Sequence, residues 1–241
     1  MTEFSVVVPT LDEEDRVEGA LRSARGALGP DAELVVVDGG SADDTRRRAS
    51  RLARVLEAGP GRGAQLDAGA RAAEGRVLVF LHADSRLPAG AGPAIRRALE
   101  GPGAVAGCFR FALEPPAPRL SRWSLLEAGV RLRTRLFRTA TGDQTLFATR
   151  AAYRAAGGAP HWELFEDVEL VRRLREVGRF VPLALEAPTS RRRWEREGFW
   201  RTVAVHLLLR LGYRLGVPPS RLARRYRVGR EVGDGGRPVP G

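Results

Sequence analysis

The sequence contains no lysine, and its 40 Lys or Arg residues are therefore all arginines. The formal net charge is +11 at pH 7, and guanidinium groups pair well with phosphate, so nucleotides, phosphorylated molecules and anionic membranes are compatible partners. Aromatic residues are also scarce, at 7%. They lie mostly in apolar runs and not between the arginines, which is atypical of a nucleic-acid-binding surface. We therefore expect no nucleic-acid partner.

Cysteine is nearly absent. The single residue, Cys108, excludes an internal disulfide, and its apolar context AVAGCF is typical of a buried side chain and not of a nucleophile. The N-terminal segment MTEFSVVVPT has no basic region and contains a proline, unlike a signal peptide. No apolar run reaches the ~20 residues that span a bilayer. These features predict a cytoplasmic protein.

The length and composition are typical of one large globular domain. The chain has 241 residues, of which 43% are hydrophobic and 29% charged, and single cores stop growing at about 250–300 residues. The expected strands are 4–8, 34–37, 55–56, 77–81, 104–113 and 144–148. The expected helices are 17–28, 41–53, 64–74, 120–137 and 169–177. Their alternation predicts an α/β fold with a Rossmann-like, mostly parallel sheet flanked by helices.

Polar clusters follow three of the expected strands directly. They are the segments 9–14, 38–41 and 82–84, with the sequences PTLDEE, DGGS and HAD. In an open α/β sheet, ligands bind beyond the carboxyl ends of the strands. We therefore expect the three clusters to line one cleft.

Seven motifs occur in an order and spacing that resemble family-2 glycosyltransferases, most closely a small soluble bacterial-type subgroup. They are VVVPTLDEE, VVVDGGSADDT, GRGAQLDAG, FLHADSRLP, TGDQTLF, FEDVEL and SRRRWEREG. The resemblance implies a GT-A domain over 1–199, with a donor half at about 1–113 and an acceptor half at about 114–199. It also implies an inverting transfer of a sugar from a nucleoside diphosphate donor, containing uridine or guanosine, to an acceptor hydroxyl.

The first clusters are candidates for nucleotide-sugar binding. The resemblance puts Pro9, Thr10 and Glu14 near the base and ribose, although acidic residues there also suit an ordinary helix N-terminus. Asp38 is placed to accept hydrogen bonds from a base or a ribose hydroxyl, or alternatively to form an Asp-Gly turn. Arg62, in the glycine-rich segment GPGRGAQLDAG, is suited to the donor phosphates. The glycine spacing does not match the dinucleotide-binding motif.

His82, Ala83 and Asp84 occupy the position of the family's Asp-x-Asp motif, which binds a divalent ion that bridges the donor diphosphate. His82 replaces the first acid. Asp84 alone is able to hold Mg²⁺ or Mn²⁺, because magnesium is usually bound by one or two carboxylates together with phosphates and water. His82 is either a second ligand, which would favour manganese, or a packed residue at a strand end.

Glu166 and Asp167 open a helix and resemble the family's acidic pair, whose aspartate is the general base. An inverting transfer needs one carboxylate to accept the proton of the attacking hydroxyl. We therefore expect Asp167 to be the base, with Glu166 beside it, and helix capping by Asp167 is compatible with this role. The resemblance also predicts acceptor or phosphate contacts for Gly142, Asp143, Gln144, Arg193 and Trp194, the alternative for the arginine being a solvated basic run.

Two other functions stay open at this stage. A nucleotidyltransferase also uses strand-end acids and a metal ion, but the glycine-rich basic signature usual near its N-terminus is missing. A catalytically inactive nucleotide-sugar-binding protein is suggested by the replacement of the first acid in the metal motif. The absence of a Ser-His or Cys-His nucleophile arrangement fits a transfer without a covalent intermediate.

The segment 200–227 is basic and predicted to form an amphipathic helix. Its apolar side comprises Trp200, Ala204, Leu207, Leu208, Leu211 and Leu215. This side either packs on the core of the domain or lies in the interface of an anionic membrane. In the second case the protein is peripheral at the inner face of the membrane, beside a lipid-linked acceptor. Residues 228–241, rich in glycine, proline and charge, are expected to be disordered.

Overall fold

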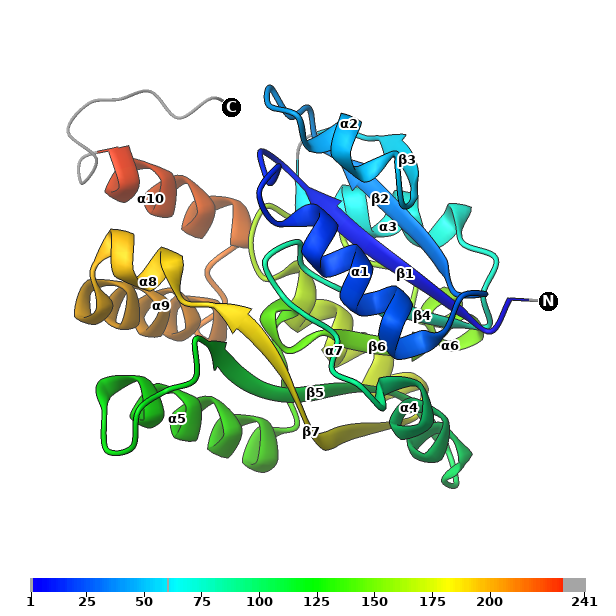
Figure 1. Cartoon of the computed structure of the whole chain (residues 1–241). Helices are drawn as coiled ribbons and strands as arrows, with labels where there is room; N and C mark the ends of the chain where they lie inside the picture. The colour runs from blue at the N-terminus through cyan, green and yellow to red at the C-terminus, as the bar shows by residue number, and fades with distance from the viewer. Residues whose placement is uncertain (1, 60, 232–241) are drawn as a thin grey trace.

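A seven-stranded sheet forms the centre of the computed structural model, which describes residues 2–59 and 61–231 (Figure 1). The strands are β1 (Phe4–Thr10), β2 (Glu33–Asp38), β3 (Arg54–Glu57), β4 (Val77–Phe80), β5 (Ala104–Glu114), β6 (Leu146–Thr149) and β7 (Arg179–Ser190). Their order across the sheet is β3-β2-β1-β4-β6-β5-β7. Only β6 among the described strands runs antiparallel to its neighbours, β4 and β5. The predicted mostly parallel sheet is therefore confirmed.

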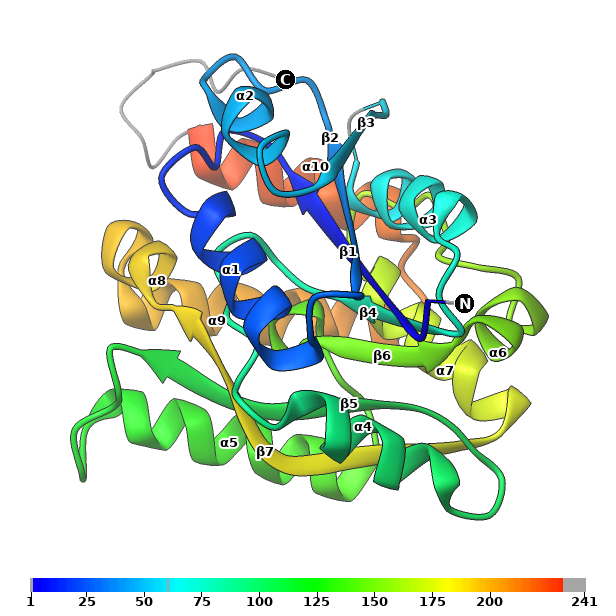
Figure 2. The same cartoon turned by 45° about the vertical axis from the view of Figure 1, so that its right-hand side comes forward.

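Helices cover both faces of this sheet (Figures 1 and 2). They are α1 (Val17–Leu28), α2 (Thr45–Ala49), α3 (Arg62–Ala72), α4 (Ala91–Glu100), α5 (Arg122–Phe137), α6 (Arg150–Ala155), α7 (Glu166–Val177), α8 (Arg192–Glu197), α9 (Phe199–Arg214) and α10 (Pro219–Glu231), with a 3₁₀ turn, η1, at Gly142–Gln144. The buried side chains of α1 and α4 pack on one face, and those of α3, α6 and α7 pack on the other. The result is a three-layer α/β structure.

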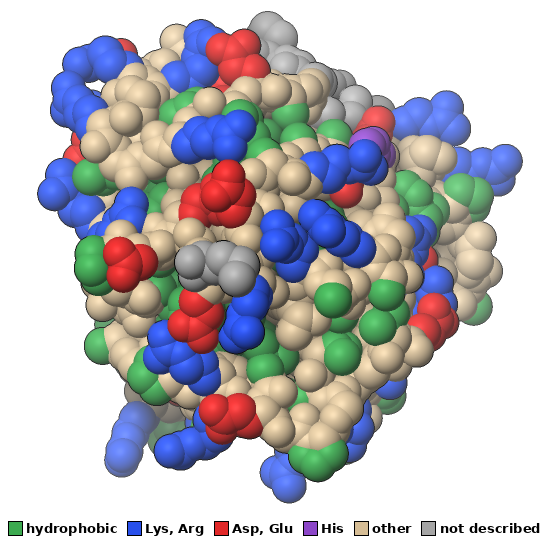
Figure 3. All heavy atoms as spheres, turned by 90° about the vertical axis from the view of Figure 1, so that its right-hand side faces the viewer, with side chains coloured by type: hydrophobic (Ala, Val, Ile, Leu, Met, Phe, Trp, Pro, Cys, Tyr) green, Lys and Arg blue, Asp and Glu red, His purple; other side chains and the backbone are tan. Residues whose placement is uncertain are grey.

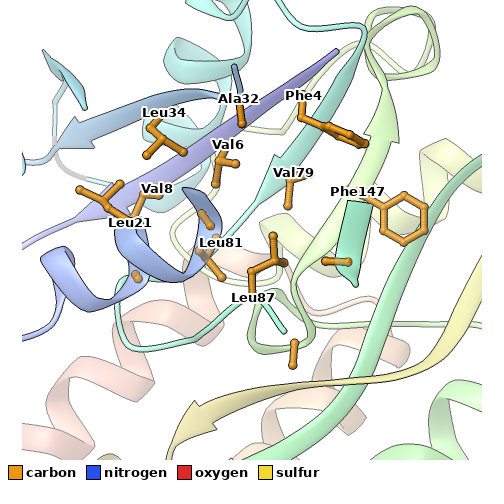
Figure 4. Close-up of a cluster of buried hydrophobic side chains, with 14 of the residues drawn as sticks. Phe4, Val6, Val8, Leu21, Ala32, Leu34, Val79, Leu81, Leu87 and Phe147 are labelled. Carbon is orange, nitrogen blue, oxygen red and sulfur yellow. The ribbon is translucent and has the colours of Figure 1, made fainter. Parts of the chain in front are cut away.

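β1 lies between two hydrophobic clusters because its side chains alternate between the faces of the sheet. Val6 and Val8 pack on the side of α1, where Figure 4 shows them close to Leu21. Val7 packs on the opposite side, against α3. A Cβ at Gly69 of α3 would lie 2.4 Å from Val7 Cγ1. Glycine at this position therefore allows α3 to pack closely on the sheet, and the close packing fixes the start of α3 near the carboxyl edge.

Several boundaries differ from the sequence-based expectations. The helix expected at 41–53 is reduced to α2, because the Ser41 hydroxyl donates to Asp38 and does not cap a helix. The strand expected at 144–148 begins at Leu146, because Gln144 belongs to η1. The long strand β7 and the helix α4 were not predicted.

The C-terminal segment forms two helices, α9 and α10, and the apolar side of α9 is exposed. Trp200, Leu208 and Leu215 are 64%, 68% and 74% exposed, so the interpretation that this side packs on the domain core is wrong. The inward side of α9 instead carries the buried Thr202 and Leu209. None of the helices in the described part of the chain has the length and apolar composition needed to cross a bilayer.

Helix α10 continues further than the sequence predicted. It ends at Glu231, four residues into the segment expected to be disordered, and the disorder of the tail stays a prediction. A single glycine in a helix costs only about 1 kcal/mol relative to alanine, which does not by itself end the helix. The remaining residues of the predicted tail, 232–241, lie outside the described residues.

Candidate active site

The polar clusters that follow β1, β2 and β4 meet at the carboxyl edge of the sheet, as the sequence predicted. Thr10 Oγ1 donates to Asp38 Oδ1 at 3.1 Å, which joins the ends of β1 and β2. Pro9 pairs with Val37 in the same ladder. Burial raises the pKa of Glu13, and the nearby charge of Asp84 raises it further. The loop after β1 therefore lies beside the loop after β4.

Asp38 is fully buried and satisfied by the protein itself. Its Oδ1 accepts hydrogen bonds from the hydroxyls of Thr10 and Ser41. Its Oδ2 accepts hydrogen bonds from the backbone N–H groups of Gly40 at 3.0 Å and Ser41 at 2.9 Å. A carboxylate offers about four acceptor positions, so all of them are used. This arrangement favours the turn-forming alternative, and nucleotide binding by Asp38 stays a prediction.

The two glutamates after β1 have different surroundings. Glu14, the predicted nucleotide contact, accepts a hydrogen bond from the backbone N–H of Asp44 at 3.1 Å and so orders the loop before α2. Glu13 Oε2 is buried and has no hydrogen-bond partner, with Arg16 Nη1 at 3.6 Å and Arg192 Nη2 at 3.9 Å. The sequence did not distinguish Glu13 from its acidic neighbours. Its open acceptor is suited to a sugar hydroxyl.

Asp84 is held at the site by the end of β7. The Ser85 hydroxyl donates to Thr189 Oγ1 at 2.9 Å, and the backbone N–H of Ser190 donates to the Asp84 carbonyl oxygen at 3.1 Å. The Asp84 carboxylate itself has only long contacts, 3.4 Å from Ser85 Oγ and 3.5 Å from Thr189 Oγ1. Burial raises the pKa of Asp84, although the charge of Arg62 opposes this. The carboxylate therefore has acceptor capacity left for a cation.

His82 packs against the backbone of Gly142. A Cβ at Gly142 would lie 2.3 Å from His82 Nε2. Burial, followed by the charges of Arg62 and Arg193, lowers the pKa of His82 well below its usual value. The imidazole is therefore neutral at neutral pH, which is the form that binds metals. Its packing against Gly142 equally fits the alternative of a packed strand-end residue, and Ala83 beside it is buried.

The side chains present fit a divalent ion that takes most of its ligands from elsewhere. Within residues 2–59 and 61–231, no group of three or more His, Cys, Asp or Glu side chains is arranged to hold a metal ion. Asp84 supplies one carboxylate with open acceptor positions, and His82 is its neutral neighbour. This donor set suits Mg²⁺ or Mn²⁺ coordinated mainly by a diphosphate and water.

The helix α7 begins with two buried acids that differ in their partners. Asp167 Oδ2 accepts the backbone N–H of Gly142 at 2.7 Å, and Oδ1 accepts that of Val168 at 2.7 Å. Glu166 Oε1 lies 3.5 Å from Arg62 Nη1. Burial, followed by the charge of Asp167, raises the pKa of Glu166 to about 7. The carboxylate of Asp167 is thus oriented by the main chain, whereas Glu166 depends on Arg62.

Arg62, the first residue of α3, lies among the acids of the site. Burial lowers its pKa, but attraction by Glu166, Asp167, Asp84 and Asp143 outweighs that effect and raises it. All four acids belong to clusters that the sequence singled out. The structure therefore brings the predicted phosphate-binding arginine, metal ligand and base together.

Arg193 and Trp194 are only partly consistent with their predicted roles. The Trp194 ring packs against Phe199 and His206, with centroid distances of 5.9 and 5.3 Å. This packing occupies the indole in a small aromatic cluster and gives sugar stacking no support. Arg193 lies near the site, since its charge lowers the pKa of His82. Its guanidinium carbon also lies 5.4 Å from the Tyr226 ring centroid.

Residues 5–156 match the sequence family described as Glycosyl transferase family 2. The match covers more than half of the chain, and the chain therefore belongs to glycosyl transferase family 2. No curated protein sequence matches the chain significantly.

Several solved structures share the fold of this chain. TarS 1-349 from S. aureus is 17% identical with a TM-score of 0.64, and the match covers 78% of this chain and 60% of TarS 1-349. Mannosyltransferase PcManGT from Pyrobaculum calidifontis is 21% identical with a TM-score of 0.59, covering 77% and 56%. Glucosyl-3-phosphoglycerate synthase from Mycobacterium tuberculosis is 22% identical with a TM-score of 0.57, covering 90% and 81%. These similarities establish the GT-A fold.

Proposed function

We propose that this chain is an inverting glycosyltransferase that moves a sugar from a nucleoside diphosphate sugar to an acceptor hydroxyl. The observation that carries the proposal is Asp167, a buried carboxylate oriented by the Gly142 N–H on the same edge as Asp84 and Arg62. The mannosyltransferase above was crystallised with GDP-Man and Mn²⁺, and the synthase with UDP and either Mn²⁺ or Mg²⁺. These complexes support UDP or GDP as the nucleotide and Mn²⁺ or Mg²⁺ as the ion.

The reaction is a single displacement. The Asp167 carboxylate accepts the proton of the acceptor hydroxyl while the hydroxyl oxygen attacks the anomeric carbon of the donor. The bond between that carbon and the diphosphate oxygen breaks, and its electron pair leaves with the diphosphate. Attack from the side opposite the leaving group inverts the configuration at the anomeric carbon.

The leaving diphosphate needs positive charge around it. Arg62 is placed to provide this, because its contact with Glu166 is long at 3.5 Å and is easily exchanged for a phosphate oxygen. Arg193 is a second candidate, since its charge, like that of Arg62, acts on His82. Asp84, with His82 beside it, would hold the divalent ion, which when bound supplies Lewis-acid stabilisation of the leaving group.

Residues 1–199 are proposed to form the transferase, with the donor half at about 1–113 and the acceptor half at about 114–199. The segment 200–227 is proposed to bind the membrane.

The outward sides of α5 and α9 form an exposed apolar surface, termed here the α5–α9 face. It comprises Leu125, Leu132, Leu136, Trp200, Leu207, Leu208, Leu211 and Leu215, all more than half exposed. On α5 these leucines lie opposite the buried Trp123 and Thr134.

An anionic bilayer suits the α5–α9 face better than a second copy of the chain does. Helix α9 contains no acid, and the one acid of α5, Glu127, is buried and paired with Arg131. Exposed arginines, among them Arg122 and Arg214, flank the leucines. Two such faces would repel each other, whereas anionic lipid attracts both the apolar side chains and the arginines. We therefore propose a lipid-linked acceptor at the inner face of the cytoplasmic membrane.

The central experiment compares the wild type with Asp167→Asn. Release of UDP or GDP from a panel of nucleotide sugars is measured, together with nucleotide affinity by calorimetry. The amide keeps the shape of the carboxylate but is a far weaker base, so turnover is expected to fall by ~10²-fold or more with nucleotide affinity unchanged. Glu176→Gln, an exposed position on the same helix, is the matched control and should keep full activity.

Each other result selects a different function. Full activity in Asp167→Asn would move the role of base to Glu166. Nucleotide binding without any turnover in the wild type would indicate a catalytically inactive binding protein. Release of pyrophosphate from a nucleoside triphosphate and a sugar phosphate would indicate a nucleotidyltransferase.

A further inference from the structure

Helices α5 and α9 lie side by side and run in the same direction. Near their starts, the rings of Trp123 and Phe199 are 5.0 Å apart. Near their ends, the guanidinium carbon of Arg214 lies 5.0 Å from the centre of the Phe137 ring. Residues four positions apart share a helix face. Arg133 lies four residues before Phe137 on α5, and Arg210 lies four residues before Arg214 on α9. The two arginines therefore face each other between the helices.

Arg133 carries a charge that no carboxylate in the described part of the chain contacts directly, although Asp143 and Asp167 attract it from beyond 4.0 Å. Its Nη2 donates to Thr141 Oγ1 at 3.1 Å and to Gln144 Oε1 at 2.9 Å, both neutral groups. Its Nε is buried and has no hydrogen-bond partner. No carboxylate lies within 4.0 Å of its guanidinium among the described residues. A buried donor that is left unpaired destabilises the protein, and more so when it is charged.

Arg210 is in a similar position on α9. It is half-buried, and within residues 2–59 and 61–231 its guanidinium forms neither a hydrogen bond nor an ion pair. Asp143 and Asp167 attract it from a greater distance, while Arg214 repels it. Burial lowers the pKa of both guanidiniums, and repulsion by Arg210 contributes to a pKa of about 10 for Arg133. Neither guanidinium is thus in direct contact with a carboxylate of the described residues.

We propose that Arg133 and Arg210 bind a phosphate group on the acceptor substrate. The proposal rests on the transferase function proposed above and adds the chemical class of the acceptor. Thr141 and Gln144, which hold Arg133, flank Gly142, whose N–H orients the base Asp167. A phosphate between α5 and α9 therefore brings the rest of the acceptor to the base.

This site is separate from the place proposed for the donor diphosphate. The donor phosphates are assigned first to Arg62 and Asp84, which follow β3 and β4 in the donor half, with Arg193 as a second candidate. Arg133 and Arg210 belong to helices of the acceptor half and of the C-terminal segment. Their planar guanidiniums are suited to bidentate contacts with one phosphate group. The phosphate comes either from a free phosphorylated molecule or from a lipid phosphate.

The test uses the full-length protein saturated with UDP or GDP and Mn²⁺, so that the donor site is filled. Inorganic phosphate is titrated by calorimetry and by thermal shift. The wild type is expected to bind phosphate, whereas Arg133→Met and Arg210→Met should each lose at least tenfold in affinity, with nucleotide affinity unchanged. Arg135→Met, an exposed position on α5, is the matched control and should bind phosphate like the wild type.

A second readout separates anion binding from a structural role. Without phosphate, Arg210→Met should have a Tm equal to or higher than that of the wild type, because the substitution removes like-charge repulsion in a partly buried place. A lower Tm in the absence of phosphate would indicate a structural role and overturn the proposal. Dioctanoyl phosphatidate as a competitor identifies the source, since tighter binding than inorganic phosphate indicates a lipid phosphate and equal binding a soluble one.

Two results contradict the proposal without affecting the transferase function. One is a wild-type protein that binds nucleotide but shows no response to inorganic phosphate. The other is loss of nucleotide binding in Arg133→Met or Arg210→Met, which would assign these arginines to the donor site. Failure of the transferase function itself is detected separately, by absence of turnover in the wild type.

Discussion

Among single residues, we expect Asp84 to make nucleotide binding depend on a divalent metal ion. Its carboxylate has only two contacts, at 3.4 and 3.5 Å, and a divalent ion would fill its open acceptor positions. We expect Mn²⁺ to raise the affinity of the wild type for UDP or GDP at least tenfold over EDTA, and Asp84→Asn to show no such difference. Asp31→Asn, at an exposed aspartate, is the control for titrations by calorimetry.

His82 is tested by the same titrations. If its neutral imidazole is a ligand, His82→Ala should lower the affinity for Mn²⁺ more than that for Mg²⁺, because imidazole is the softer donor. If it is a packed residue, both ions should be affected equally. Metal-independent nucleotide binding in the wild type, or metal-dependent binding retained in Asp84→Asn, would contradict the metal site.

Glu166 should make the stability of the protein depend on pH. Its pKa in the folded protein is raised to about 7 by burial and by Asp167, whereas an unfolded glutamate has a pKa near 4.3. The folded state therefore binds an extra proton between these pH values. The contribution of Glu166 to the stability of the protein is present below about pH 4.5 and is lost as the pH rises through 7.

The measurement is the Tm of the wild type and of Glu166→Gln at pH 5 and pH 8. The amide does not titrate, so the Tm of the variant minus that of the wild type should be several °C larger at pH 8 than at pH 5. This difference corresponds to a free energy of unfolding on the order of 2–3 kcal/mol. Glu176→Gln, at an exposed glutamate, should follow the wild type. A difference between Glu166→Gln and wild type that is the same at both pH values would mean that Glu166 does not titrate in this range.

The residues of the site were predictable to the extent that their chemistry is local. Asp84 follows a strand, and Asp167 lies at the start of a helix. Both positions can be predicted from the sequence. The full hydrogen bonding of the Asp38 carboxylate within the protein was not predictable, because one of its partners, Thr10, is 28 residues away. Glu13 likewise differs from Glu14 only through groups on other segments, such as Arg192.

At the scale of elements, helix α9 shows what hydrophobic periodicity does and does not determine. The pattern correctly predicted a helix with one apolar side. It did not determine which side faces the domain, because the contacts of a helix depend on the surface beneath it. That surface is mixed here: Phe199 and Leu209 of α9 pack into apolar clusters, and Asp143 and Asp167 attract Arg210. These contacts occupy the inward side of α9, and its leucine-rich side is turned outward.

The strand β7 was missed for a different reason. It contains Pro182 and Pro188, and proline within a run is unfavourable for a strand that pairs on both sides. β7 is the last strand in the sheet, and its ladder among the described strands is with β5; its other side has a bridge from Thr189 to Ser85 but no second ladder that the prolines would interrupt. Its contribution matters for the site, because Thr189 and Ser190 at its end hold the loop that carries Asp84.

On the scale of the whole molecule, the positive charge is unevenly balanced. Figure 3 shows a face on the side away from α9 on which arginines alternate with acidic side chains. On α5 and α9, by contrast, the exposed arginines have no exposed acid on the same helix. On these two helices the positive charge therefore coincides with exposed apolar side chains. This coincidence is expected of a surface that binds anionic lipid.

The α5–α9 face predicts binding of the whole protein to anionic membranes. Burial of each exposed leucine in the interface contributes up to about 1.5–3 kcal/mol, and each arginine near an anionic surface about 1 kcal/mol. The protein should sediment with phosphatidylglycerol-containing vesicles at low salt, less at high salt, and not with phosphatidylcholine vesicles. The double variant Leu207→Gln with Leu211→Gln should reduce sedimentation at least tenfold. Val177→Gln, on α7, is the control and should sediment like the wild type. A wild-type protein that stays in the supernatant, or a double variant that binds as well as the wild type, would refute a membrane role for this face.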